Sequence, residues 1–376
     1  MHPKAARNIS IEALRLVAVA GIAIFHTFQW TFQAVCTSLP EYAPLAVFPY
    51  SGALGFINLL GCWANEVFFM ISGYFLITSA ARAWSDGATW TSQLQRTTQR
   101  LGKVILPSAF YCLAALAWST AVSPIPDVAL NTHYWYTLGL EFIWVYAATV
   151  FMAPWFGLAK SRLSQKSYTT AVIAVGILTF VVNGYLAAMS ATSAGEFSWL
   201  QKIMSAVTYV VAFLMGGLLR DVTDAMDSDR AGALGMRSLV TVLILTIILE
   251  GELSFTGNLT AMAALSYKST SLISFTLAAT SLLFSATRDN KSNHPRAANV
   301  IVTLSTATLG FYVMQSLTSS LWRPVFNTLL ANILISQNSP AAICIVTGTV
   351  ISIVFALTLL IIDAARSLIA RRLKRQ

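Results

Sequence analysis

Residues 55–79 read GFINLLGCWANEVFFMISGYFLITS. About 20 apolar residues suffice for a helix to cross the hydrocarbon core of a bilayer, and this stretch is longer than that. Glu66 is its one charged side chain. We therefore interpret residues 55–79 as a transmembrane helix.

The rest of the chain has the same character. Apolar residues make up 56% of its 376 residues. Charged residues make up 10%, whereas an ordinary soluble domain has about 25%. Apolar windows predict spans at 12–33, 55–79, 104–123, 134–157, 168–190, 203–219, 238–256, 269–287, 299–322 and 340–362. We therefore predict an all-α, polytopic membrane helix bundle of about ten transmembrane helices.

The basic residues predict the orientation of this bundle. Twenty of the 24 Lys and Arg residues fall in the two tails and the even-numbered connections, and Lys202, Lys268 and Arg323 fall on the opposite side. Cytoplasmic connections are enriched in Lys and Arg, so both termini are predicted to be cytoplasmic. The net charge of +9 follows this pattern and has no aromatic interleaving, which argues against a nucleic-acid partner.

No second domain is predicted. Residues 1–376 form one transmembrane domain, in which 82–103 is a cytoplasmic interfacial segment and 363–376 is a basic cytoplasmic tail. The four cysteines and four histidines have no spacing typical of metal ligands, so no metal site is predicted.

Ionisable side chains are costly inside a bilayer and usually mark function. Arg15 and His26 lie about 20° apart around one helix, because eleven residues make almost three full turns. At 1.5 Å per residue from each cytoplasmic end, four polar residues reach a common depth of roughly 20–24 Å. They are His26, Glu66, Glu141 and Gln315. Each alone could be a helix-packing group, but together they favour a functional site.

The chemistry that such residues support is general-base catalysis. A neutral imidazole at His26 can take the proton of a hydroxyl that attacks an acyl carbonyl. A carboxylate at Glu66 can orient the imidazole and stabilise its protonated form. Fingerprints of serine hydrolases, zinc proteases and nucleotide-binding proteins are not found.

Four segments also carry a family resemblance. The chain resembles the family 3 membrane acyltransferases, which include many bacterial O-acetyltransferases. The first segment runs from Ile11 through Arg15 to His26, with the Arg-x10-His spacing. The second is Glu66–Leu76, with its acid, aromatic pair and Ser-Gly-aromatic. Arg96 and Arg100 before Pro107 form the third, and His133–Glu141 forms the fourth. This chain departs from the pattern at Tyr136, which takes the position of a tryptophan, and at Gln315, where many members have His.

The resemblance implies an acyltransferase that takes an acyl group, usually acetyl, from cytoplasmic acyl-CoA. The acceptor would be a hydroxyl of a cell-surface glycan or its lipid-linked precursor, at the plasma membrane. No bound cofactor is expected beyond this donor substrate. The implied catalytic residues are His26, Glu66 and Glu141. Donor binding would fall to Arg15, Ser72, Tyr74 and Arg100, and acceptor binding or support to Asn65, Trp135, Tyr136, Tyr312 and Gln315.

Two other functions stay open at this point. A transporter or flippase of a lipid-linked sugar could also bury His and Glu in such a bundle. No inverted repeat or Gly/Pro-broken helix favours it. A glycan polymerase or ligase would carry several arginines in large outer loops, where only Arg323 is expected.

Overall fold

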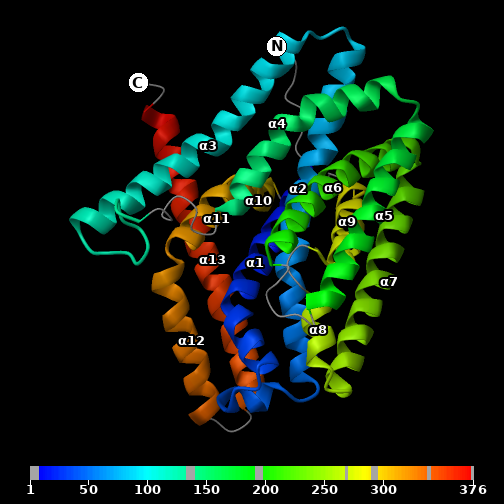
Figure 1. Cartoon of the computed structure of the whole chain (residues 1–376). Helices are drawn as coiled ribbons and strands as arrows, with labels where there is room; N and C mark the ends of the chain where they lie inside the picture. The colour runs from blue at the N-terminus through cyan, green and yellow to red at the C-terminus, as the bar shows by residue number, and fades with distance from the viewer. Residues whose placement is uncertain are drawn as a thin grey trace.

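The computed structural model describes residues 8–132, 140–190, 198–266, 270–288, 295–336 and 340–373. These ranges are helical and contain no strand. Figure 1 shows the elements, which are α1 (Ile9–Cys36), η1 (Pro40–Leu45), α2 (Tyr50–Ser85), α3 (Trp90–Ala121), α4 (Glu141–Arg162), α5 (Gln165–Ser190), α6 (Ser198–Ala225), α7 (Ser228–Phe255), α8 (Leu259–Leu265), α9 (Leu272–Ala286), α10 (Pro295–Ser305), α11 (Thr308–Leu317), α12 (Ser319–Ser336) and α13 (Pro340–Leu373).

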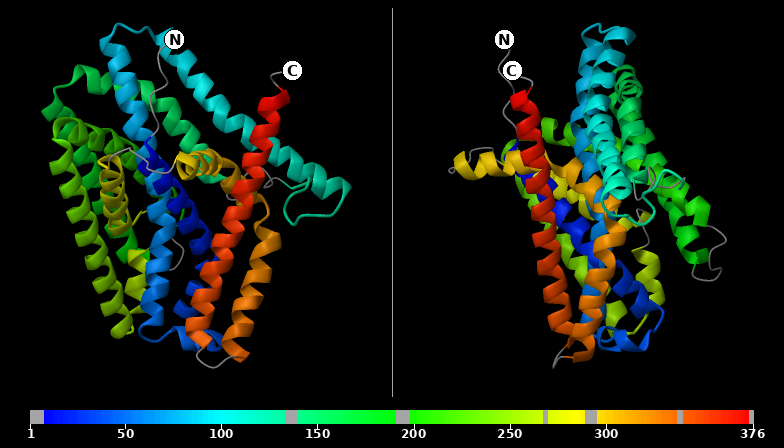
Figure 2. Two further views of the ribbon diagram at one scale, coloured as in Figure 1. Left: turned by 180° about the vertical axis from the view of Figure 1, so that it is seen from behind. Right: turned by 90° about the vertical axis from the view of Figure 1, so that its left-hand side faces the viewer.

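The multi-pass helical fold is as predicted. Among the described helices, eight are long and apolar enough to cross a membrane, namely α1 to α7 and α13. The pair α10 and α11, bent by 43°, makes a ninth if it counts as one span, and α9 is apolar but shorter. Both ends of the chain lie at the same end of the bundle (Figures 1 and 2), as an even number of crossings requires. The expected ten spans and the cytoplasmic termini remain predictions.

Helix α2 is the central helix and packs against α1, α4, α6 and α9. Its crossing with α6 depends on two glycines. A Cβ at Gly73 would collide with the carbonyl of Phe213, and one at Gly216 would collide with the carbonyl of Met70. Small residues let membrane helices approach this closely. The close contact fixes the α2 segment that carries Asn65, Glu66 and Ser72.

The region of the expected ninth span differs from the prediction. Residues 299–322 are divided among α10, α11 and the start of α12. Arg323 was expected in an outer loop, but it lies in α12 with its guanidinium against His26. The reason is that the helices break after Ser305 and after Leu317. Residues Ser319–Ser336 then form the separate helix α12, which includes Arg323, where the apolar window predicted the end of a span and a loop.

Helices α3 and α4 also depart from the simple picture of parallel spans. In Figure 1, α3 runs obliquely away from the end at which both termini lie. Its last turn and the start of α4 lie about halfway along the bundle, whereas η1 and the start of α13 lie at the far end. Glu141, the first residue of α4, is therefore placed near the middle of the molecule.

Candidate active site

One face of α1 connects the two ends of the candidate site. Arg15, Val19, Ile22 and His26 follow one another at helical spacing along this face. Arg15 donates to Glu12 at 3.0 Å, and Glu12 also accepts from Ser305 of α10 at 2.6 Å. Arg15 is thus paired with Glu12, and this pair holds Arg15 next to α10.

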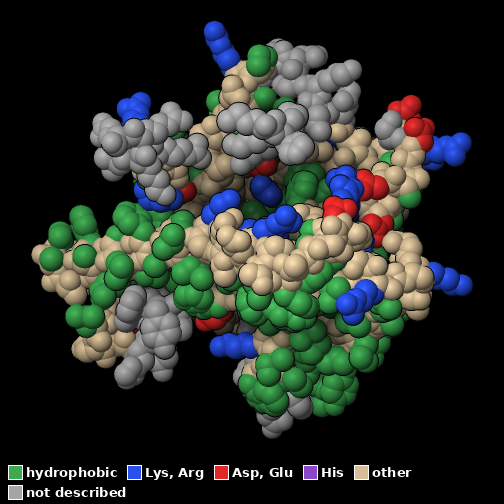
Figure 3. Space-filling model, turned by 90° about the horizontal axis from the view of Figure 1, so that it is seen from above, with side chains coloured by type: hydrophobic (Ala, Val, Ile, Leu, Met, Phe, Trp, Pro, Cys, Tyr) green, Lys and Arg blue, Asp and Glu red, His purple; other side chains and the backbone are tan. Residues whose placement is uncertain are grey.

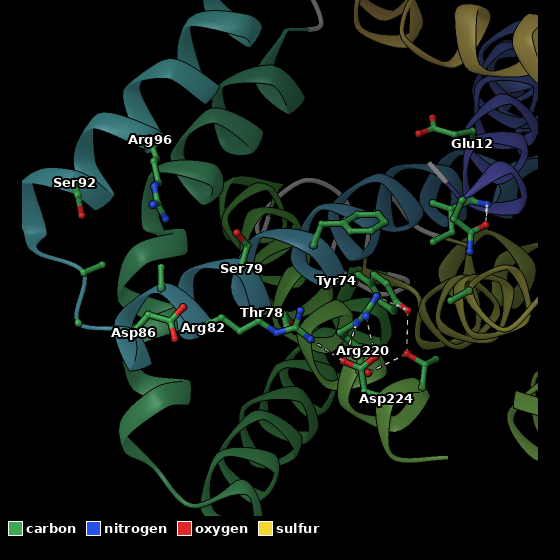
Figure 4. A pocket seen from close by; sticks show the side chains of 18 residues that line it. Glu12, Tyr74, Thr78, Ser79, Arg82, Asp86, Ser92, Arg96, Arg220 and Asp224 are labelled. Atoms are coloured by element: carbon green, nitrogen blue, oxygen red, sulfur yellow. Dashed lines mark hydrogen bonds and ion pairs between the residues drawn. The ribbon is translucent and has the colours of Figure 1, made fainter. Parts of the chain in front are cut away.

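A cavity of about 920 Å³ opens at the end where both termini lie. Seen from that end, Lys and Arg side chains gather around a hollow (Figure 3). Helices α1, α2, α3 and α6 form its walls (Figure 4). The charged residues that line it are Glu12, Arg82, Asp86, Arg96, Arg220 and Asp224. A mixed but strongly charged lining suits a polyanionic ligand only where some cations stay free of carboxylates.

Tyr74 is the one expected donor-binding residue in the lining of this cavity. Its hydroxyl accepts from Arg220 at 3.3 Å and bonds Thr223 at 2.9 Å, and the guanidinium lies 5.0 Å from the ring centroid. Arg220 in turn holds Asp224 through two contacts of 2.8 and 2.9 Å. Arg96 forms no ion pair with any described residue and is exposed at the opposite wall.

A smaller chamber of about 140 Å³ lies deeper, between α1, α2, α3, α4 and α11. Val19 and Ile22 contribute the α1 wall, and its aromatic lining is Phe68, Phe142, Tyr146, Phe311 and Tyr312. Along α1 and α2, Arg15 and Ser72 lie between the residues that line the cavity and those that line the chamber. Ser72 bonds the hydroxyl of Tyr146 at 2.8 Å. The chamber therefore lies deeper in the bundle than the cavity, with Arg15 and Ser72 between the two.

His26 lies one helical turn beyond the chamber. Its Nδ1 is 3.2 Å from a terminal nitrogen of Arg323 and 3.5 Å from Oε1 of Gln29. A guanidinium can only donate, so Nδ1 accepts from Arg323 and the neutral imidazole carries its proton on Nε2. The contact with Gln29 is at the limit of hydrogen-bond length, and the shorter, charged contact governs the tautomer.

Glu66 and Asn65 face different helices. Glu66 is fully buried toward Ser274 of α9, but neither carboxylate oxygen has a hydrogen-bond partner within 3.5 Å. No hydrogen bond joins Glu66 to His26. Asn65 donates to the hydroxyl of Tyr209 at 3.0 Å, while its own Oδ1 is buried without a partner. The expected dyad of imidazole and carboxylate is therefore not assembled in this structure.

Tyr312 lines the chamber, whereas Glu141 is the exposed first residue of α4. Tyr312 packs on Phe142, the residue after Glu141, with ring centroids 4.7 Å apart. Gln315, one turn further along α11, is buried, and its Nε2 has no partner. Its backbone carbonyl accepts from Trp322 at 2.9 Å, which ties α11 to the residue before Arg323.

Three of the expected site residues are not placed at the cavity or the chamber. Arg100 lies on α3 one turn after Arg96 and does not line the cavity. Trp135 and Tyr136 lie outside the described residues.

The sequence analysis missed four residues. The structure brings three of them, Arg323, Arg220 and Tyr209, to the candidate site, and the fourth, Glu250, is a buried carboxyl group like Glu66. Arg323 and Arg220 were counted as loop charges, although α12 and α6 both continue past them and an apolar run follows Arg323. Tyr209 stacks on Phe69 at 4.6 Å and carries no charge that would have singled it out. Glu250 of α7 is buried with both oxygens unpartnered, and it was not singled out because it lies near the end of the span predicted at 238–256.

Comparison with known proteins agrees with the resemblance of the motifs. A family model described as an acyltransferase domain matches residues 8–359, nearly the whole chain. No curated protein and no solved structure matches it. The matched range includes α1, α2, the cavity, the chamber and the His26–Arg323 contact. The chain therefore belongs to acyltransferase family 3 and is a membrane acyltransferase.

Proposed function

We propose that this protein transfers an acyl group, usually acetyl, from cytoplasmic acyl-CoA to a hydroxyl of a cell-surface glycan or its lipid-linked precursor at the plasma membrane. The observation that carries the proposal is the α1 face along which Arg15, the chamber wall and His26 follow one another. This face extends from the charged cavity end, along the chamber wall, to the half-buried imidazole of His26.

The donor fits this route by its chemistry. Coenzyme A has an anionic nucleotide end and a long, uncharged pantetheine arm that carries the thioester. The nucleotide would bind in the cavity, where Arg96 is free of carboxylates and Tyr74 and Arg220 form one wall. The arm would pass Arg15 and Ser72 so that the acyl group enters the aromatic chamber. Arg100 would act from the adjacent turn of α3 on the part of the donor outside the cavity.

The reaction would proceed by direct attack on the thioester. His26 is the proposed general base for the acceptor hydroxyl. Glu141, which precedes Phe142 of the chamber wall, would act from the start of α4, and Glu66 supplies a buried carboxyl group for proton transfer. Asn65, Gln315, Tyr312 and the two aromatic residues at 135 and 136 would support the acceptor.

The orientation is part of the proposal. The end that carries the cavity would be cytoplasmic, since Lys and Arg gather there. Single cysteines at Ala88 and Leu39, in a variant whose four native cysteines are replaced, test this with a membrane-impermeant maleimide in intact cells. Labelling at position 39 alone is expected, and labelling at position 88 alone would reverse the orientation.

The activity is tested in inside-out membrane vesicles that contain the protein and its host glycans. Radiolabelled acetyl-CoA should transfer its label to the glycan fraction, and mild base should release the label, as it cleaves an O-ester. Vesicles with the His26→Ala variant are the matched control. Movement of a lipid-linked sugar across the bilayer without label in the glycan would instead support the flippase function.

A further inference from the structure

Arg323 stands out because it is a cation in the bundle without an anionic partner. It forms no ion pair with any residue that the structure describes, and its Nε is buried without a hydrogen-bond partner. Its terminal nitrogen instead contacts the neutral ring of His26 at 3.2 Å. A charge held in this way is costly, and the cost is offset when an anion arrives at the guanidinium.

The same contact blocks the proposed base. Because Arg323 donates to Nδ1, the lone pair of Nδ1 is occupied and Nε2 carries the ring proton. No nitrogen of His26 is then free to accept a proton. Any base catalysis by His26 therefore requires Arg323 to leave Nδ1.

The anion that could draw Arg323 away is the one that the reaction creates. When a hydroxyl attacks a thioester, the carbonyl oxygen gains negative charge, and donors aimed at this oxygen stabilise the transition state. The guanidinium has five N–H donors, and the Nε–H is already unused and buried. It lies beside the imidazole at which the hydroxyl must lose its proton.

We propose that Arg323 is a catalytic residue that exchanges the Nδ1 atom of His26 for the carbonyl oxygen of the bound thioester. The exchange frees the base and binds the oxyanion in one movement. The acceptor O–H bond breaks, its proton moves to Nδ1, and its oxygen bonds the acyl carbon while the carbonyl electron pair moves to the oxygen held by Arg323. Collapse of this oxyanion breaks the carbon–sulfur bond, and the thiolate takes the proton from His26. This inference rests on the proposed acyl transfer.

The first test measures the resting contact without any substrate. The chain has four histidines, so ¹⁵N-histidine labelling in nanodiscs gives few signals, and the His26→Gln spectrum assigns the one from His26. An unprotonated Nδ1 and a protonated Nε2 are expected in the wild type, with a shift toward the other tautomer in Arg323→Ala. A protonated Nδ1 in the wild type, or an unchanged Arg323→Ala spectrum, would overturn the proposed contact.

The second test measures catalysis in the vesicle assay. Arg323→Ala should lower the rate of transfer about 10²–10³-fold, as removal of an oxyanion donor does, while binding of acetyl-CoA is unchanged. Millimolar methylguanidinium should restore part of the rate, which a misfolded variant would not allow. Gln29→Ala is the control, since its longer contact to the same nitrogen is exposed. A folded Arg323→Ala with normal rate, or one that methylguanidinium does not rescue, would reject the oxyanion role. Absence of transfer in the wild type would reject the proposed function while the spectrum still reports the contact.

Discussion

The charged groups at the cavity end and the polar groups of the interior differ in whether they have bonding partners. At the cavity end, Arg220 holds Asp224 through two contacts and Lys160 holds Asp221 at 2.6 Å. In the interior, polar atoms are left without partners. They include both oxygens of Glu66, Oδ1 of Asn65, Nε2 of Gln315 and Nε of Arg323.

This difference separates two roles of polar side chains, which are to hold helices together and to bind a substrate. A paired charge stabilises the contact of two helices and has little capacity left for a ligand. An unsatisfied buried group costs roughly 1–3 kcal/mol, so it is retained where a substrate later supplies the partner. Mutation of a paired charge at the cavity end is therefore expected to affect mainly stability, and mutation of an unpartnered group at the candidate site mainly catalysis.

The largest effect is expected for His26→Ala. Loss of a general base typically lowers the rate about 10²–10⁴-fold, and the interior position predicts that folding and donor binding are kept. Transfer of radiolabel from acetyl-CoA is measured in vesicles, with insertion and monodispersity checked on the purified variant. Near-normal transfer by His26→Ala would place the base elsewhere.

A stability effect is expected for Lys160→Ala. The ammonium group is largely buried and also donates to the carbonyl of Gly217, so it ties α4 to α6. Removal of one partner of a buried pair costs about 3–5 kcal/mol, and the melting temperature in detergent should fall clearly. Arg82→Ala is the control, since its exposed pair with Asp224 contributes about 0–1 kcal/mol. Equal melting temperatures for the two variants would contradict the structural role of the pair.

Glu66→Gln is expected to lower transfer about 10²-fold, the lower end of the range for loss of a proton-transfer group. Glu250→Gln is a close match, because Glu250 is also a buried carboxyl group with two unpartnered oxygens but lies against Gly55 of α2, away from the chamber. Rates per folded protein are compared in the same vesicles. Equal losses of the transfer rate in both variants would show that the loss comes from disturbed helix packing and not from the position of Glu66 at the site.

The parts of the site that lie on long, regular helices could be predicted from the sequence. Arg15 and His26 share a face because α1 is continuous between them. Regular helical geometry is local, so spacing alone predicts it.

The parts that depend on helix breaks and tilts could not be predicted. Depth was calculated at 1.5 Å per residue as if all spans crossed the membrane directly. The oblique course of α3 invalidates this calculation for Glu141, and the helix breaks before α12 explain why Arg323 does not lie in the expected outer loop. Both errors arise from tertiary packing, which no hydropathy window contains.

Arg15→Ala tests the boundary between the two regions. Arg15 is paired with Glu12, yet it lies between the cavity and the chamber. A lost charge-assisted contact to a phosphate is worth about 1.5–3 kcal/mol, so affinity for acetyl-CoA should fall about ten- to a hundredfold. Titration calorimetry measures it, with Arg237→Ala, exposed on α7, as the control. Unchanged affinity in a folded Arg15→Ala protein would assign Arg15 to the structural pairs.

Gln315→Ala should have the smallest effect on the transfer rate. It tests whether a neutral, unpartnered group of the interior contributes to catalysis. The Gln315 side chain is buried and its Nε2 is unpartnered, so the resting enzyme loses no hydrogen bond from that atom. What is lost is a neutral hydrogen bond to the bound substrate, worth about 0.5–1.5 kcal/mol, or about two- to tenfold in transfer. The tie from α11 to Trp322 uses the backbone carbonyl and survives the substitution, so Arg323 should keep its place and the ¹⁵N signal of His26 should not change. A dead Gln315→Ala beside an active His26→Ala would reverse the assignment of the base, whereas a shifted His26 signal would show that Gln315 acts by positioning α12.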